Sequence, residues 1–255
     1  MRIVVKIGTS TLAHAGGRLN IRHTEELVKT LSDLKNAGHE LILVSSGAIG
    51  LGAGKLQISR PQDMPTKQAA ASVGQCELMY VYDQLFGQYN HTVAQILVTR
   101  EDFDFEDRCM NLENTIYRLL QLGAVPIINE NDSVATEEIA VGDNDTMGAI
   151  VARYMQADLL VVLSDIDGLY TADPHAHPDA TLISRVEAIP PTIEQLAGGA
   201  GSTLGTGGMA TKLSAAKIAT AAGVDMVIAN GGTPSLLYDI VEGKPVGTRF
   251  VGQKG

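Results

Sequence analysis

The chain has 255 residues and a formal net charge of -10, and its apolar residues are mostly aliphatic, with aromatic residues at 4% and no tryptophan. This length allows a sizeable core, and α/β folds of this size often form one domain. An acidic chain without a block of lysine or arginine lacks the basic footprint that nucleic-acid binding needs. No apolar run approaches membrane-spanning length, and Cys76 and Cys109 form no CxxC pair. We therefore expect a cytoplasmic protein with reduced thiols and no nucleic-acid or membrane partner.

Apolar runs that favour strands alternate with helical segments along the chain. The expected strands are Ile3–Ile7, Glu40–Val44, Thr92–Val98, Val125–Ile128, Leu159–Leu163 and Asp225–Ala229. Such continuous apolar runs are typical of strands that are covered on both faces. The alternation predicts an α/β fold, a three-layer αβα sandwich with a mainly parallel open sheet, in a single domain over residues 1–255.

The helices are expected between these strands. Asn20 is a plausible N-cap for the first, and Gly38 a plausible stop. The others are Thr66–Leu85, Asn111–Leu122, Asp145–Met155 and Thr211–Ala222. Two regions show only a weak strand or helix pattern and are called the weak regions below: His14–Arg18 and Asp173–Gly205. Both are expected to be surface loops or a short hairpin.

Two polar clusters are the most informative feature of the chain. The run Asn129–Asp132 begins where the strand Val125–Ile128 ends, and Gly142–Asp145 follows it. In an open α/β sheet, ligands bind just beyond the carboxyl ends of the strands. The amides and carboxylates could bind the amine and carboxylate of a small zwitterion, or orient lysines or a magnesium ion. Ordinary turn chemistry explains either cluster alone, but two clusters together with glycine loops favour a ligand site.

Three glycine loops follow strands or open helices: Lys6–Ser10, Val44–Ile49 and Gly205–Lys212. Glycine lets the backbone approach an anion, and a helix N-terminus attracts one. Each loop alone is a common connector, but three loops, two of which carry a lysine, indicate a nucleoside triphosphate. The alternatives fit less well, because the chain has no G-x-x-x-x-G-K-[ST] loop, no GxGxxG opening its first helix and no GxSxG elbow.

Seven stretches of the chain together resemble the glutamate 5-kinase family of the amino-acid kinase superfamily. They are Val5–Ser10, Val44–Ile49, Lys67–Gln75, Ile127–Asp132, Val141–Asp145, Gly168–Pro174 and Gly205–Lys212. The matches run in order through residues 3 to 250, and the Asn-Glu-Asn-Asp and Gly-Thr-Gly-Gly-Met stretches distinguish this family from aspartate, acetylglutamate, uridylate and carbamate kinases. Many members also carry a C-terminal PUA domain; because the chain ends near Phe250, we expect a short form without that domain. This departure leaves regulation and oligomeric form open.

The resemblance implies transfer of the ATP γ-phosphoryl group to the side-chain carboxylate of L-glutamate, the first step of proline biosynthesis. A carboxylate is already ionised at neutral pH, so the reaction needs positioning and charge neutralisation and no general base. The implied catalytic residues are Lys6 and Lys212, held by Asp145. The implied glutamate-binding residues are Ser46, Asp132 and Asn144, with Asp132 suited to the ammonium and Ser46 and Asn144 to the carboxylates.

The resemblance also implies an ATP site, with the N-terminal part of the chain mainly binding glutamate and the C-terminal part mainly binding ATP. Its residues are Lys6, Gly8, Gly47, Ser164, Asp165, Thr206, Gly207, Gly208, Met209, Ala210, Thr211 and Lys212. The alternative for each lysine is a surface residue near a loop, and the alternative for Asp145 is an N-cap, a role that is compatible with holding the lysines. Without the resemblance, Ser164-Asp165 is interpreted as a strand-end cap.

No metal site made by the protein is expected. Mg²⁺ would bind mostly through ATP oxygens and water, and His175 and His177 lie in a Pro-rich loop with no clear third ligand.

The implied partners are glutamate, ATP, proline as a feedback inhibitor, further copies of the chain, and the reductase that consumes the product. Two other functions stay open: another acid kinase of the superfamily, or a non-catalytic amino-acid sensor.

Overall fold

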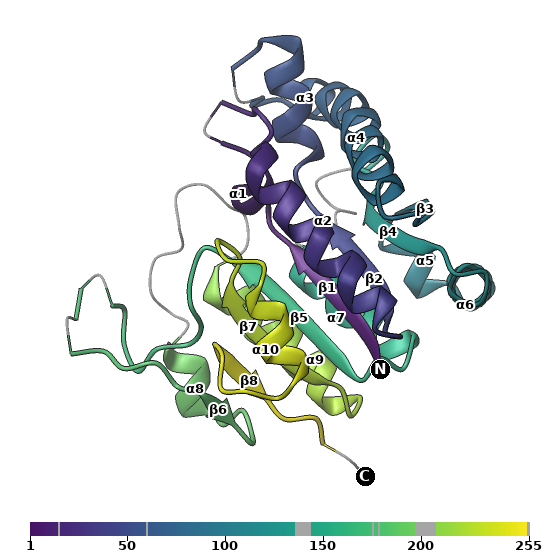
Figure 1. Cartoon of the computed structure of the whole chain (residues 1–255). Helices are drawn as coiled ribbons and strands as arrows, with labels where there is room; N and C mark the ends of the chain where they lie inside the picture. The colour runs from purple at the N-terminus through teal and green to yellow at the C-terminus, as the bar shows by residue number, and fades with distance from the viewer. Residues whose placement is uncertain are drawn as a thin grey trace.

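The structure is a computed structural model, and it describes residues 1–14, 16–59, 61–135, 144–174, 176–177, 179–196 and 208–253. Over these residues the strands form one sheet in the order β3-β4-β2-β1-β5-β7-β8-β6 (Figure 1). Their bounds are β1 Arg2–Ile7, β2 Glu40–Ser45, β3 Val93–Val98, β4 Val125–Glu130, β5 Leu159–Ser164, β6 Arg185–Val186, β7 Asp225–Asn230 and β8 Thr248–Phe250. The pairings from β3 through to β7 are parallel, while β8 is antiparallel to β7. The predicted mainly parallel sheet is confirmed.

The helices lie between the strands in the expected alternation. Their bounds are α1 Thr9–Leu12, α2 Ile21–Asn36, α3 Ala48–Leu56, α4 Met64–Gly87, α5 Glu101–Asp104, α6 Glu106–Gln121, α7 Asn144–Tyr154, α8 Pro191–Leu196, α9 Met209–Ala221 and α10 Leu236–Val241. The predicted N-cap of α2 is confirmed, since the Asn20 side chain accepts a hydrogen bond from the His23 N–H. Gly38 follows the end of that helix with φ 93°, a left-handed conformation that favours glycine.

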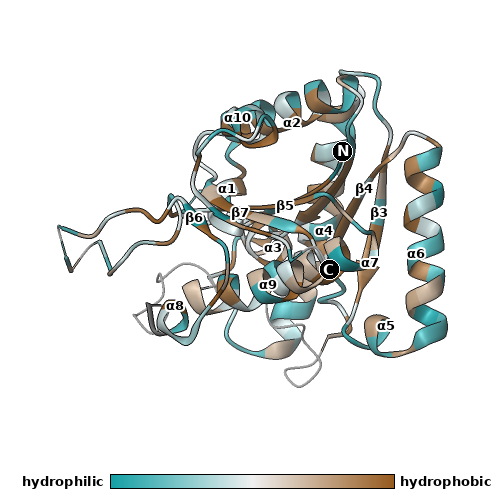
Figure 2. Cartoon of the chain, turned by 90° about the horizontal axis from the view of Figure 1, so that it is seen from below, coloured by the Kyte–Doolittle hydropathy of each residue, from teal (hydrophilic) through white to brown (hydrophobic). Residues whose placement is uncertain are grey.

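Alternate residues of the strands build two hydrophobic cores, one on each face of the sheet. In β1, Val4 packs into the core that α6, α7 and α9 cover, while Ile3 and Val5 pack into the core that α2, α4 and α10 cover. Figure 2 shows the apolar strands between these helix layers, with α2 and α10 on the side opposite α7 and α9. The period of two therefore directs Lys6 toward α7 and α9, because it shares a face with Val4. The predicted three-layer α/β sandwich is confirmed.

The first of the two weak regions matches one of the predicted alternatives, a short hairpin, whereas the second contains elements that the sequence does not predict. Ala13 and Leu19 form an antiparallel bridge, so the first region is the tip of a short hairpin. In the second region, Leu182 forms a similar bridge with Tyr170, which precedes the region, and β6 and α8 were not expected there. These elements, like β8, are too short to show a periodic pattern in the sequence.

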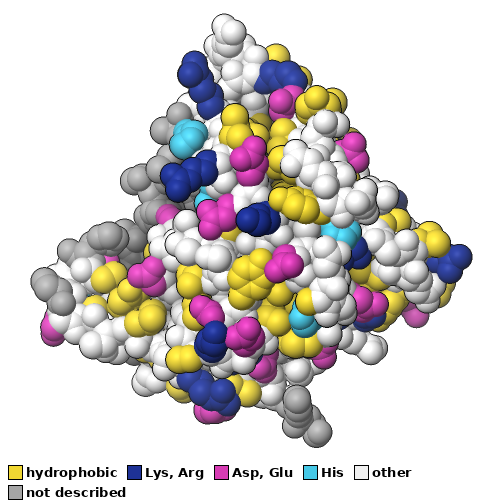
Figure 3. All heavy atoms as spheres, in the orientation of Figure 1, with side chains coloured by type: hydrophobic (Ala, Val, Ile, Leu, Met, Phe, Trp, Pro, Cys, Tyr) yellow, Lys and Arg dark blue, Asp and Glu magenta, His cyan; other side chains and the backbone are white. Residues whose placement is uncertain are grey.

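The surface shows charges of both signs. On the face shown in Figure 3, lysine and arginine side chains are interspersed with aspartate and glutamate. None of the helices that the structure describes is long and apolar enough to cross a membrane.

Candidate active site

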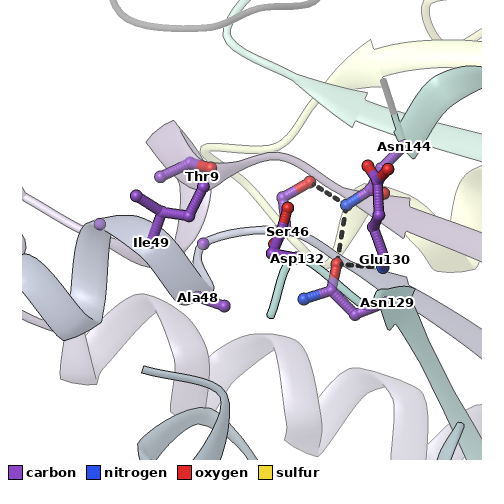
Figure 4. A pocket seen from close by; sticks show the side chains of 10 residues that line it. Thr9, Ser46, Ala48, Ile49, Asn129, Glu130, Asp132 and Asn144 are labelled. Carbon is purple, nitrogen blue, oxygen red and sulfur yellow. Dashed lines mark hydrogen bonds between the residues drawn. The ribbon is translucent and has the colours of Figure 1, made fainter. Parts of the chain in front are cut away.

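An open cavity of about 140 Å³ lies where β1, β2 and β4 end (Figure 4). It is lined by Thr9, Ser46, Gly47, Ala48, Ile49, Gly50, Asn129, Glu130, Asp132 and Asn144. Parallel strands bring their carboxyl ends to one edge of a sheet, which is where ligands bind in open α/β folds.

One wall of the cavity is the first turn of α3. The chain leaves β2 through Ser46 and enters the helix through Gly47, whose φ of 106° is the left-handed conformation that favours glycine. Ala48, Ile49 and Gly50 then line the cavity. The first backbone N–H groups of a helix have no partner within it, so this wall suits an anion such as a carboxylate or a phosphate.

Three side chains from different elements are joined by hydrogen bonds in the cavity (Figure 4). Asn144 Nδ2, at the start of α7, donates to Ser46 Oγ at 2.7 Å and to Asn129 Oδ1 at 3.1 Å. It also lies 3.3 Å from the Ser45 carbonyl oxygen. The structure thus brings Ser46 and Asn144 together, as the sequence predicts. Because Nδ2 is already engaged, the side of Asn144 left for a ligand is Oδ1, which suits an ammonium rather than the expected carboxylate.

Asp132 and Glu130 place two carboxylates on the same cavity. Burial raises the pKa of Asp132 to about 6, and the negative charge of Glu130 adds to this shift. A cationic group bound beside Asp132 would favour the ionised form of that carboxyl. No individual role was predicted for Thr9, Asn129 or Glu130, although the last two belong to the same polar run as Asp132.

Lys6, Asp145 and Lys212 meet beneath this edge of the sheet. Lys6 Nζ lies 2.6 Å from Asp145 Oδ1, and Lys212 Nζ lies 3.1 Å from Oδ2. Thr211 Oγ1 also donates to Oδ2, at 3.1 Å. Asp145 is fully buried and both lysines are nearly so, which shows that the reading of the lysines as surface residues is wrong.

The electrostatics of this cluster are governed by the two ammonium groups. Burial alone would raise the pKa of Asp145, but Lys6 and Lys212 outweigh burial and hold that pKa below its usual range. Asp145 is therefore ionised at neutral pH and fixes both lysines in place. Positive groups held rigidly in a buried site are what the transfer of a phosphoryl group requires.

Gly47, which was expected to bind ATP, lines the cavity instead, while other residues expected to bind ATP lie nearer these lysines. A Cβ atom added to Gly8 would lie 3.7 Å from Lys6 Nζ, and the pairing of Ile7 with Leu163 brings Ser164 to the same edge. Ser164 is buried and donates to Asp165 Oδ1 at 3.0 Å. Gly208 precedes α9, whose first turn carries Met209, Ala210, Thr211 and Lys212. Thr206, Gly207 and His175 lie outside the described residues.

This fold and site define a kinase for a small molecule, and a model of the Amino acid kinase family matches residues 1–230. The chain is 55% identical over 249 residues to glutamate 5-kinase from Clostridium tetani, covering 97% of this chain and 93% of that protein. It is 50% identical over 259 residues to glutamate 5-kinase from Clostridium perfringens, covering 100% and 96%. The chain belongs to the amino acid kinase family and, within it, to the glutamate 5-kinases.

The fold is shared with more distant structures. Carbamate kinase from Giardia lamblia, bound to AMP-PNP, has a TM-score of 0.72 and 17% identity, with 98% of each chain covered. At this identity the likeness is evidence for the fold alone.

Proposed function

We propose that this chain transfers the γ-phosphoryl group of ATP to the side-chain carboxylate of L-glutamate, giving L-glutamate 5-phosphate for proline biosynthesis. One observation carries the proposal. Asn144 and Asp145 are consecutive residues in the first turn of α7; Asn144 lines the cavity of amides and carboxylates, and Asp145 holds the buried lysines. An acid bound in the cavity therefore lies beside the positive groups that phosphoryl transfer needs.

Glutamate binds in the cavity by charge and hydrogen bonding. Asp132, with Glu130 beside it, receives the α-ammonium, and Asn144 Oδ1 is a further acceptor for it. The Ser46 hydroxyl accepts a bond from Asn144, so its hydrogen remains available for a substrate carboxylate. The N–H groups of the first turn of α3 supply further donors.

Phosphoryl transfer then depends on Lys6 and Lys212. The substrate carboxylate oxygen attacks the γ-phosphorus in line and ADP leaves, while the two ammonium groups neutralise charge on the migrating group. Gly8, Gly47 and Gly208 offer backbone N–H groups to phosphate oxygens. Ser164, Asp165 and the segment from Thr206 to Lys212 contact the nucleotide.

Mg²⁺, when bound with ATP, neutralises part of the phosphate charge. Among the residues that the structure describes, no three His, Cys, Asp or Glu side chains gather as a metal site. A metal held mostly by phosphate oxygens and water needs no such cluster.

The experiment is an ADP-release assay with ATP and Mg²⁺ in which L-glutamate is compared with L-aspartate, N-acetylglutamate and carbamate. We expect glutamate to be phosphorylated with the highest kcat/KM. A higher kcat/KM for another acid would make the chain a different acid kinase. Binding of glutamate without ADP release would make it a sensor.

Further properties belong to the same proposal. We expect a single kinase domain in the cytoplasm, a homo-oligomer, inhibition by proline, and functional coupling to the reductase that consumes the labile acyl phosphate.

A further inference from the structure

A chain of side-chain hydrogen bonds runs from β3 through α4 to the cavity. Gln75 on α4 donates from Nε2 to Gln95 Oε1 at 3.3 Å, and its Oε1 accepts from Asn129 Nδ2 at 2.9 Å. Asn129 Oδ1 in turn accepts from Asn144 Nδ2, which donates to Ser46 Oγ. Only the last three of these five residues line the cavity; Gln75 is 8% exposed and lies behind it.

Two backbone groups fix which side chain donates and which accepts in this series of hydrogen bonds. The Glu130 N–H can only donate, and it donates to Asn129 Oδ1 at 2.9 Å. The Ser45 carbonyl can only accept, and it faces Asn144 Nδ2. The orientation of both amides is thereby defined, since a flip of either would place like groups together. Asn129 must then present Nδ2 to α4, and Gln75 Oε1 is the acceptor that receives it.

The position of Gln75 is itself constrained by backbone packing. A Cβ atom on the preceding Gly74 would overlap the Ala48 carbonyl oxygen, and one on Gly52 would overlap the Ala70 carbonyl oxygen. The helices α3 and α4 therefore pack backbone against backbone, close to the first turn of α3 that lines the cavity. Gln75 is held on a rigid support with little freedom to move away from Asn129.

We propose that Gln75 is a positioning residue for the acid-binding cavity. Through Asn129 it holds the amide of Asn144 so that Oδ1 faces the substrate ammonium, and so that the Ser46 hydroxyl hydrogen is directed to a substrate carboxylate. The proposal deepens the function above and rests on it. When Gln75 cannot accept, Asn129 Nδ2 is left buried without its partner, and the amide loses one of the bonds that hold it in place.

Gln75→Met keeps the approximate volume of the side chain and removes the acceptor. A misplaced Asn144 amide forfeits about one hydrogen bond to the substrate, which corresponds to a factor of about 10, so the KM for glutamate should rise about tenfold. The KM for ATP and kcat should change little, because the cluster of Lys6, Asp145 and Lys212 is not part of the hydrogen-bond chain. Gln84→Met, on the exposed side of the same helix, is the matched control.

A double-mutant cycle separates positioning from packing. If Gln75 acts through Asn144, then Gln75→Met should add almost nothing to the KM for glutamate once Asn144→Ala is present. Equal fold increases in both backgrounds, or equal rises in KM for glutamate and ATP, would overturn the proposal. Thermal unfolding of all variants shows whether each one remains folded.

A measurement that does not need activity distinguishes this proposal from the proposed function. The side-chain NH₂ signal of Asn144, identified by its loss in Asn144→Ala, should shift in the ¹⁵N spectrum of Gln75→Met and stay in place in Gln84→Met. An unmoved signal would overturn the positioning role even in an active kinase. Absence of glutamate phosphorylation by the unchanged chain, with a shifted signal, would instead overturn the proposed function alone.

Discussion

The lysine cluster and the acid-binding cavity adjoin in this chain but differ in almost every physical respect. Lys6, Asp145 and Lys212 are buried, and two ammonium groups share one carboxylate. The cavity is open, and it is lined by the half-buried carboxylates of Glu130 and Asp132. The first suits an anion such as a transferred phosphoryl group, and the second suits a ligand with an ammonium group.

This difference shows how one turn of helix serves two tasks. The two neighbouring residues Asn144 and Asp145 point into different environments, so one orients polar groups at the cavity and the other fixes charge in the interior. Groups that neutralise the charge of the migrating phosphoryl group act mainly in the transition state, whereas groups that hold the substrate's ammonium and carboxylate act mainly on binding. Substitutions in the cluster should therefore change kcat, and substitutions in the cavity should change KM.

The largest effect is expected from the cluster. Lys212→Ala should lower kcat by about 10²- to 10³-fold, and Lys6→Ala by a similar factor, because each removes a fixed positive group from the migrating phosphoryl group. Steady-state kinetics at saturating ATP and glutamate measure this. Lys217→Ala, an exposed lysine on the same helix that pairs with Glu194, should leave kcat unchanged. Near-normal kcat in Lys212→Ala would show that the cluster is structural.

Asp145→Ala should lower kcat in the same way and also destabilise the fold. It leaves two buried ammonium groups without their carboxylate, and the loss of one partner from a buried ion pair costs about 3–5 kcal/mol. Urea unfolding at pH 7 measures the free energy of unfolding. Because the pKa of Asp145 is lowered on folding, its contribution is present above the unfolded pKa of about 4 and is lost as the pH falls through the lower folded value. The difference in the free energy of unfolding between the unchanged chain and Asp145→Ala should therefore shrink in acid. A difference that stays constant with pH would contradict this.

Much of the cluster could be predicted from local sequence, while the hydrogen-bond chain could not. Lys6 ends a strand-like run, Asp145 opens a helix and Lys212 lies in the first turn of another, so each is found within a short motif. Gln75 meets Asn129 across 54 positions, a contact that depends on how α4 crosses the sheet. The antiparallel β8 and the two-residue β6 are set by tertiary pairing rather than by periodicity.

Substitutions in the cavity should change the KM for glutamate. Asp132→Asn should raise the KM for glutamate by about 10- to 100-fold, since a hydrogen bond to a charged group contributes about 1.5–3 kcal/mol. The KM for ATP should stay within about twofold, because the residues proposed for ATP lie around the lysine cluster. Initial rates with each substrate varied in turn measure both constants. Equal rises in the two KM values would remove Asp132 from the glutamate side and weaken the contrast between the regions.

Acid should weaken glutamate binding before it affects the cluster. The pKa of Asp132 is raised to about 6, so the carboxylate that receives the ammonium is protonated as the pH falls through that value. The KM for glutamate should then rise by up to about tenfold per pH unit below 6, a dependence that Asp132→Asn should lack. Because folding raises the pKa of Asp132, ionisation of this residue lowers the free energy of unfolding. The contribution of Asp132 to that free energy therefore falls as the pH rises from about 4 to about 6. A KM that is flat between pH 5 and pH 7.5 would contradict the assignment.

The smallest effect concerns proline, and it tests whether the cavity is also a regulatory site. Proline shares the α-carboxylate and a positively charged nitrogen with glutamate but has no side-chain carboxylate to phosphorylate. It should therefore occupy the part of the cavity formed by Ser46, Asp132 and Asn144 and stop the reaction by exclusion. Differential occupation of one site is sufficient for this inhibition, and no second site is needed. Inhibition kinetics with glutamate varied at fixed ATP should be competitive, with a proline inhibition constant that rises in Asp132→Asn alongside the KM for glutamate. Inhibition that saturating glutamate does not relieve, or that keeps its strength in Asp132→Asn, would place proline elsewhere and limit the cavity to catalysis.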